Sequence, residues 1–154
     1  MRKVILTLLL AMIAFAASAQ RLAMTDANGV LWVCGGVGAE ERRELAALEA
    51  RANLALTFVT LKRGGYLADV EVTLYEAGAK SARFKTTADG PICLLRLPAG
   101  RYRIEAAHGG AKRSAQAALA QDAQRPVRLG FAFPGEPWDG IWASDEEKRQ
   151  AKEP

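Results

Sequence analysis

Two segments, residues 65–78 and 89–105, constrain the fold of this chain most, because apolar and polar side chains alternate along both. A repeat of two residues is typical of a strand that buries one face and exposes the other. The second segment also contains Asp89-Gly90-Pro91 and Leu97-Pro98-Ala99-Gly100, which are sequences that favour tight turns. Consecutive strands joined by such turns predict an antiparallel sheet.

The same pattern extends over residues 54–133, where short runs of strand-forming residues are separated by turn residues. Residues 54–61 are apolar on both faces, as expected for a strand that is covered on both sides. Short strands at regular spacing predict a mainly β domain, a seven-stranded antiparallel β-sandwich of the immunoglobulin-like kind. The expected strands are residues 54–61, 70–75, 81–87, 92–97, 101–107, 112–119 and 126–133.

One amphipathic helix is predicted before these strands, over residues 39–52. Leu45, Leu48 and Ala52 fall on one side at helical spacing, after a break at Gly35–Gly38. Glutamates in the first turns complement the positive end of the helix dipole. We therefore expect the helix to dock its apolar side on the sheet.

The first 19 residues have the three parts of a secretory signal peptide. Arg2 and Lys3 precede an apolar run over residues 4–17, and Ala17-Ser18-Ala19 supplies small residues for cleavage. The apolar run is short for a transmembrane anchor, which needs about 20 residues. We expect cleavage before Gln20, a periplasmic or secreted location, and no membrane span in the mature chain.

The mature chain is long enough for one domain with a modest core. Residues 20–53 are expected to form a lead-in and the helix, with residues 20–29 flexible and the apolar run of residues 30–33 either a first strand or a plug against the core. The sandwich follows over residues 54–133. Residues 134–154 form a tail that contains two tryptophans, and its charged end is expected to be disordered from about Ser144.

The charge pattern bears on the partners of this protein. The net charge is +4, and loss of Arg2 and Lys3 with the signal peptide takes away two of these charges and leaves +2. Basic residues are interspersed with acidic ones, without a run of five like charges. Nucleic acid is therefore not an expected partner.

Cys34 and Cys93 are the two cysteines, and both lie in the mature chain. In an oxidising compartment, two cysteines most simply form one disulfide. The alternative is a pair of separate buried thiols, because Cys93 lies in a predicted strand where it would pack as a small apolar residue. We favour the disulfide.

Gly65–Leu74, Asp89–Pro91 and Leu97–Ile104 resemble the carboxypeptidase regulatory-like domain, a seven-stranded transthyretin-like sandwich found in many exported bacterial proteins. More closely, the chain is similar to small single-domain exported bacterial proteins that open with Gly-Gly-(Ile/Val)-Gly-x-Glu-Glu, which Gly35–Glu41 matches. The resemblance covers about Trp32 to Phe133. It implies an accessory or binding module that is not itself catalytic.

The sequence contains few candidates for catalytic residues. A hydrolase or dioxygenase on a related sandwich would need several histidines, whereas His108 is the one histidine of the chain. No metal-ligand spacing and no Gly-x-Ser-x-Gly sequence occurs. The loop Gly35–Gly38 is interpreted as a hinge rather than an anion site, because Glu40 and Glu41 would repel phosphate. We expect no enzyme activity, cofactor or metal.

Two tryptophans and a group of four basic residues are candidates for binding a partner. Trp138 and Trp142 lie outside the predicted core and either cover an end or edge of the sandwich or form an exposed aromatic platform. Arg101 and Arg103, with Lys112 and Arg113 on the neighbouring predicted strand, either meet an acidic partner or form a solvated edge.

These observations predict an exported, non-enzymatic β-sandwich module that binds an envelope protein, a peptide or a glycan. One alternative is a structural or stress-related envelope protein without a discrete ligand. A small hydrolase is the last alternative.

Overall fold

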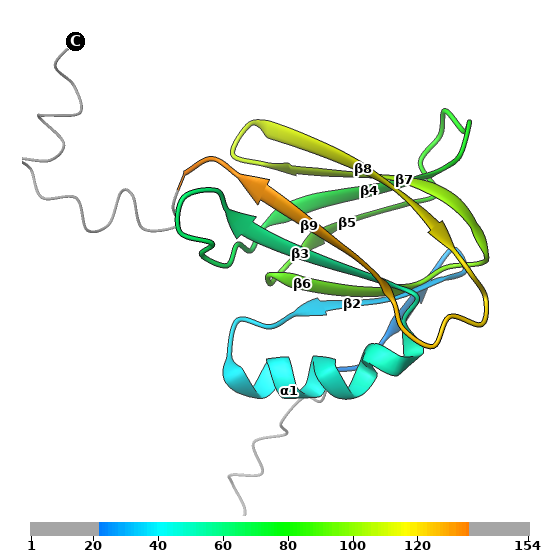
Figure 1. The fold of residues 1–154 in the computed structure, drawn as a ribbon, viewed down its shortest axis with the longest axis horizontal. Helices are drawn as coiled ribbons and strands as arrows, with labels where there is room; N and C mark the ends of the chain where they lie inside the picture. The colour runs from blue at the N-terminus through cyan, green and yellow to red at the C-terminus, as the bar shows by residue number, and fades with distance from the viewer. Residues whose placement is uncertain (1–21, 136–154) are drawn as a thin grey trace, which may run out of the picture.

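The computed structural model describes residues 22–135, which form a mainly β protein with one α-helix (Figure 1). Within these residues there are nine strands, and a short 3-10 helix continues the α-helix. The elements in chain order are β1 (Thr25–Ala27), β2 (Val30–Gly35), α1 (Ala39–Leu48), η1 (Glu49–Arg51), β3 (Leu54–Thr60), β4 (Val70–Glu76), β5 (Phe84–Ala88), β6 (Ile92–Arg96), β7 (Gly100–His108), β8 (Ala111–Leu119) and β9 (Val127–Phe133).

The strands form two sheets. The five-stranded sheet has the order β1-β2-β6-β3-β9, and the four-stranded sheet has the order β5-β4-β7-β8. The mainly β class and the single helix predicted from the sequence are confirmed. The predicted count of seven is wrong, because two further strands, β1 and β2, precede the helix. The antiparallel prediction is also wrong at one place, since β9 pairs with β3 in parallel.

The N-terminal hairpin corrects the prediction of a flexible lead-in over residues 20–29. Ala27 pairs with Val30 across a two-residue turn formed by Asn28 and Gly29. Both turn residues have positive φ, 56° and 73°, which is the geometry of the hairpin turns that Asn-Gly favours. This turn sequence holds β1 against β2 at the edge of the five-stranded sheet.

Side chains of both sheets form one hydrophobic core. The alternation predicted along β4 places Val70, Val72 and Leu74 inward, all fully buried. They pack in one cluster with side chains from β3 of the other sheet, such as Leu56 and Phe58. Burial of large apolar side chains at about 25 cal/mol per Å² is the main source of stability in a domain of this size.

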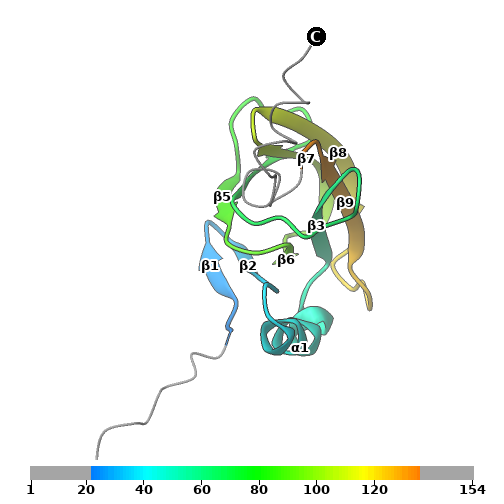
Figure 2. The same ribbon diagram turned by 90° about the vertical axis from the view of Figure 1, so that its left-hand side faces the viewer.

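Helix α1 lies against the outer face of the five-stranded sheet, away from the four-stranded sheet (Figure 2). Leu45 is buried in a second cluster with Val33, Ala55 and Leu94, and Leu48 packs at its margin. The predicted docking of the apolar side of the helix is confirmed. Strand β3 is therefore covered on both faces along its first half, which explains its apolar sequence.

The disulfide between Cys34 and Cys93 is confirmed. The two residues are directly opposite each other on β2 and β6, with Cα atoms 4.1 Å apart. Both side chains lie within the core cluster that contains side chains of both sheets. The bond therefore joins the strand before the helix to the centre of the five-stranded sheet.

The close packing of the Asp89-Gly90-Pro91 turn against β2 requires glycine at position 90. A Cβ atom added at Gly90 would lie 2.3 Å from the carbonyl oxygen of Gly35, far inside a van der Waals contact. The turn into β6 thus crosses the end of β2 at a distance that only glycine permits.

Candidate functional site

The outer face of the four-stranded sheet is a polar surface that contains the predicted site residues Arg101 and Arg103. Helix α1 packs on the other sheet, so within residues 22–135 no helix covers this face. Alternation along β4 and β7 points the residues between the core positions to this side. They are joined by neighbours from both edge strands, and the face includes Glu71, Thr73, Tyr75, Lys85, Arg101, Arg103, Glu105 and Lys112.

The centre of this face is a shallow hollow of about 160 Å³. Its floor contains small side chains, Thr73 and Ala107, and its sides are formed by long charged ones. Lys85 lies 3.8 Å from Glu71 across β5 and β4. At the other end, Glu105 forms an ion pair with Arg103. The hollow is therefore polar and has charge of both signs at its margins.

Tyr75 gives this face one aromatic side chain. It pairs with Arg103 across β4 and β7, and the guanidinium carbon of Arg103 lies 4.1 Å from the ring centroid. At this distance the cation is attracted to the face of the ring. Arg103 is thus held between the ring of Tyr75 and the carboxylate of Glu105, which leaves it less free than Arg101 to meet a partner.

Cations outnumber carboxylates on this face. Lys85, Arg101, Arg103 and Lys112 are the cations, and Glu71 and Glu105 are the carboxylates, as the strand register places them. Among the ion pairs of the described residues, none involves Arg101 or Lys112. These two exposed cations give the face a positive surplus that favours an acidic partner.

The structure places Arg101 and Arg103 on one side of the four-stranded sheet and Arg113 on the opposite side. Arg101 and Arg103 are two residues apart on β7 and point to the same side of the sheet. Arg113 of β8 points away, because its Nε donates to the carbonyl of Ala132 on β9 at 3.1 Å. This contact protects the open edge of β9, which is a structural role.

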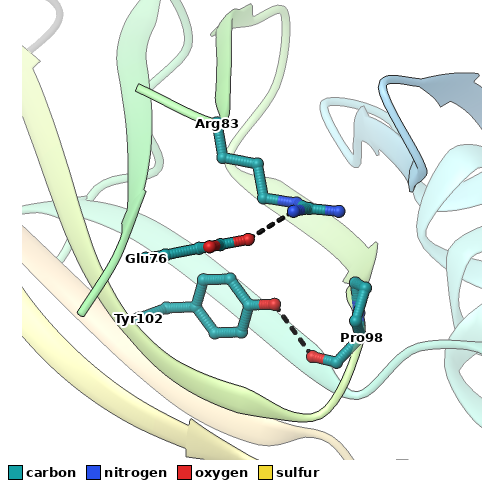
Figure 3. A network of polar contacts seen from close by, with 4 residues as sticks. All are labelled: Glu76, Arg83, Pro98 and Tyr102. Atoms are coloured by element: carbon teal, nitrogen blue, oxygen red, sulfur yellow. Dashed lines mark hydrogen bonds and ion pairs between the residues drawn. The ribbon is translucent and has the colours of Figure 1, made fainter. Parts of the chain in front are cut away.

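A second polar cluster lies at the end of the four-stranded sheet (Figure 3). Arg83 forms an ion pair with Glu76, and the hydroxyl of Tyr102 donates to the carbonyl of Pro98 at 2.9 Å. Burial raises the pKa of Tyr102; the Arg83 guanidinium lowers this pKa, and the Glu76 carboxylate raises it. A tyrosine at the start of a strand that bonds back to the preceding turn is a structural device of β-sandwich proteins. We assign this cluster to stability.

The loop Gly35–Gly38 is filled by the chain itself. Oε2 of Glu41 accepts hydrogen bonds from the backbone N–H groups of Gly36, at 2.9 Å, and Val37, at 3.1 Å. The donors that would hold a phosphate in an anion-binding loop are thus occupied by a carboxylate from the first turn of α1. The loop acts as the turn into the helix, where Gly36 takes a φ of 95°.

The sequence predicts His108, beside Gly109 and Gly110, to be an exposed turn residue. In the structure it ends β7 and is half-buried. Its ring packs edge-on against Phe133, with centroids 5.8 Å apart. Among residues 22–135 no group of three or more His, Cys, Asp or Glu side chains is arranged to hold a metal ion. In the same range no helix has the length and apolarity to cross a membrane.

Two predicted site residues, Trp138 and Trp142, lie outside the described residues, and so does the predicted signal peptide. Sequence reasoning did not single out Tyr75, Glu105 or Lys85 as members of a site. The alternation along β4 and β7 places the first two on the same face as Arg101. The position of Lys85 depends on the pairing of β5 with β4.

Comparison with known proteins gives no family for this chain. No family model matches the sequence, and no curated protein matches it either. The described residues therefore show a mainly β protein with two sheets, a docked helix and a polar sheet face.

Proposed function

We propose that this protein is an exported, non-enzymatic binding module that meets an acidic protein or peptide through the outer face of its four-stranded sheet. The observation that carries the proposal is the positive surplus on that face, with Arg101 and Lys112 exposed and outside the ion pairs of the described residues. Opposite charge at an interface steers the partner and fixes its orientation.

The shape of the face favours an extended segment of a partner. The hollow between Lys85 and Lys112 runs across the strands, and its floor is low at Thr73 and Ala107. Carboxylates of an acidic segment would lie beside the cations at the two margins. A glycan is the alternative partner, and Tyr75 is the side chain that would contact it; Arg103 already covers one face of that ring.

At the level of fold, we propose that the two sheets form a transthyretin-like sandwich of the carboxypeptidase regulatory-like type. Strands β3–β9 supply seven strands over the proposed domain, and the core contains side chains of both sheets. Export is proposed from the sequence of residues 1–19, and the buried disulfide is suited to an oxidising compartment. Mass spectrometry of protein from the periplasm should give a chain that begins at Gln20.

Binding to the sheet face is tested with two labelled probes, a glutamate-rich peptide and an oligogalacturonate, measured by fluorescence anisotropy. We expect the peptide to bind and the double variant Arg101→Glu/Lys112→Glu to lose that binding. Lys62→Glu/Lys80→Glu is the matched control, because it makes the same change of charge at exposed positions in the loops after β3 and β4. Added salt should weaken the binding of the peptide.

Three results would count against this proposal. Equal loss of binding in the control variant would show a general charge effect. Binding of the oligogalacturonate alone would identify a glycan-binding face. Absence of binding to both probes, together with no protein captured by crosslinking in intact cells, would favour the structural envelope protein.

A further inference from the structure

One end of the five-stranded sheet has an exposed apolar surface that the proposed function does not use. Among residues 22–135, the large apolar side chains that remain exposed are Val37, Leu61 and Tyr66, at 66%, 58% and 54% of their full accessibility. Leu61 and Tyr66 lie in the loop that follows β3, where Leu61 bonds to Phe133 at the end of β9, and Val37 lies in the loop between β2 and α1. Large apolar side chains that gather on a surface mark a place where something packs.

Backbone pairing joins two of these side chains, Leu61 and Tyr66, to neighbours on the outer face of the sheet; Val37 is not part of this row. Val59 pairs with Ala132 of β9 on one side and bridges Tyr66 on the other. Since Phe58 points into the core between the sheets, Val59 and its two partners face the opposite side. Leu61 directly follows the end of β3 and donates its N–H to the carbonyl of Phe133 at 2.8 Å. We call Val59, Leu61, Tyr66 and Ala132 the end patch.

We propose that the segment Trp138-Asp139-Gly140-Ile141-Trp142 of this chain packs on the end patch. The chain leaves β9 at Phe133, whose carbonyl is bonded to a member of the patch, and Trp138 follows five residues later. Five residues span at most about 18 Å, so the first indole is tethered beside the patch. A short tether gives an effective concentration in the millimolar range, which favours this segment over a free partner.

The composition of the segment fits the patch. Trp138, Ile141 and Trp142 supply three large apolar side chains, and Asp139-Gly140 between them is a sequence that permits a turn. An indole can cover the ring of Tyr66 and the methyl groups of Leu61 while its N–H stays in water. The segment therefore removes from water the same kind of surface that the sheet leaves exposed.

Next to the end patch, the charge of the surface is also complementary to that of the tail. A groove of about 120 Å³ runs between α1 and the sheet, with an apolar floor that includes Ile92 and Leu94. Arg42 lies at its rim, and so do Arg128 and Glu49, which form an ion pair with each other. In the sequence, three carboxylates follow Trp142, at Asp145-Glu146-Glu147. An acidic stretch that follows the two tryptophans would lie beside Arg42, whose guanidinium donates to the carbonyls of Gly36 and Val37 and is in none of the ion pairs of the described residues.

The test measures the indole N–H resonances of the full mature chain by NMR, assigned with Trp138→Phe and Trp142→Phe. We expect at least one tail indole to be displaced from its position in urea-unfolded protein. Leu61→Glu and Tyr66→Glu, both at exposed positions, should return it to that position. Ala118→Glu is the control, because it places the same charge on an exposed strand residue of the other sheet. The resonance of Trp32, which packs against Phe84, reports that the core is intact.

Several outcomes would overturn the inference. Tail indoles at their unfolded positions in the wild-type chain would show that the segment does not pack. A displacement that survives both Leu61→Glu and Tyr66→Glu would place the segment elsewhere. A displacement that disappears on dilution would assign the occupant to a second copy of the chain. None of these results depends on binding at the four-stranded sheet, so the two proposals fail separately.

Discussion

The side chain of Asn53 and the backbone of Leu97 are joined by two hydrogen bonds inside the protein. Leu97 donates its N–H to Oδ1 of Asn53 at 3.0 Å, and Nδ2 of Asn53 donates to the carbonyl of Leu97 at 2.8 Å. Asn53 is 1% exposed, and its backbone also bonds to Leu95 and Val127. One residue therefore connects the start of β3, the turn between β6 and β7, and the start of β9.

Replacement of Asn53 by leucine should destabilise the protein by about 2–3 kcal/mol, because two buried backbone groups of Leu97 would lose their partners. Urea unfolding followed by circular dichroism measures this loss. Gln121→Ala is the control, since Gln121 accepts from Ala99 N–H at the surface of the same turn and should cost less than about 0.5 kcal/mol. Equal effects of the two substitutions would show that burial of the Asn53 pair is not what matters.

Gly90→Ala should destabilise the protein by about 3 kcal/mol or more, because its new methyl group would overlap the backbone of Gly35. Gly130→Ala is the matched control. It lies in β9, has a φ that any residue adopts, and a Cβ added there meets no atom within 4 Å. The melting temperature should fall for the first variant and stay within a few degrees for the second. A stable Gly90→Ala protein would contradict the close crossing of β2 by this turn.

The strands between residues 54 and 133 could be predicted because the alternation of side chains is local. Val70, Val72 and Leu74 show their buried face in the sequence alone. Strand β1 was missed although Asn28-Gly29 is a strong hairpin sequence, because the three residues before it are too few to show alternation. The parallel pairing of β3 with β9 is a property of topology and has no local pattern.

Part of the candidate site could also be predicted from the local sequence pattern. Arg101 and Arg103 share a face because they are two residues apart on one strand. Their neighbours depend on register: Arg103 lies against Tyr75 only because β4 and β7 pair at those residues. The structural role of Asn53 could not be predicted from the sequence. It depends on side-chain hydrogen bonds to Leu97 and Ala120, which are 44 and 67 residues away.

Tyr102 should make stability depend on pH in the alkaline range. Burial raises its pKa in the folded protein above 10.0, its ordinary value, which we take for the unfolded chain. The folded state therefore keeps the proton where the unfolded state loses it. The stabilisation is complete below pH 10 and is lost as the pH rises through the folded pKa.

Tyr102→Phe isolates this effect, because the hydroxyl and its hydrogen bond to Pro98 are both removed. At pH 7 the variant should be less stable by about 1 kcal/mol. The difference from the wild type should shrink as the pH rises above 10, measured by urea unfolding at each pH. Tyr75→Phe serves as the control for a tyrosine on the outer face. A difference that stays constant from pH 7 to pH 11 would contradict the raised pKa.

The disulfide between Cys34 and Cys93 should contribute about 4 kcal/mol to stability in the chain-entropy treatment, because the residues are 59 positions apart. The double variant Cys34→Ala/Cys93→Ala should therefore unfold at a markedly lower urea concentration. Since both side chains are buried, a reductant should act slowly on the folded protein and rapidly once urea opens it. Thiol labelling over time, with and without urea, measures both rates. Fast labelling of the native protein in reductant would show that the core at β2 and β6 opens without global unfolding.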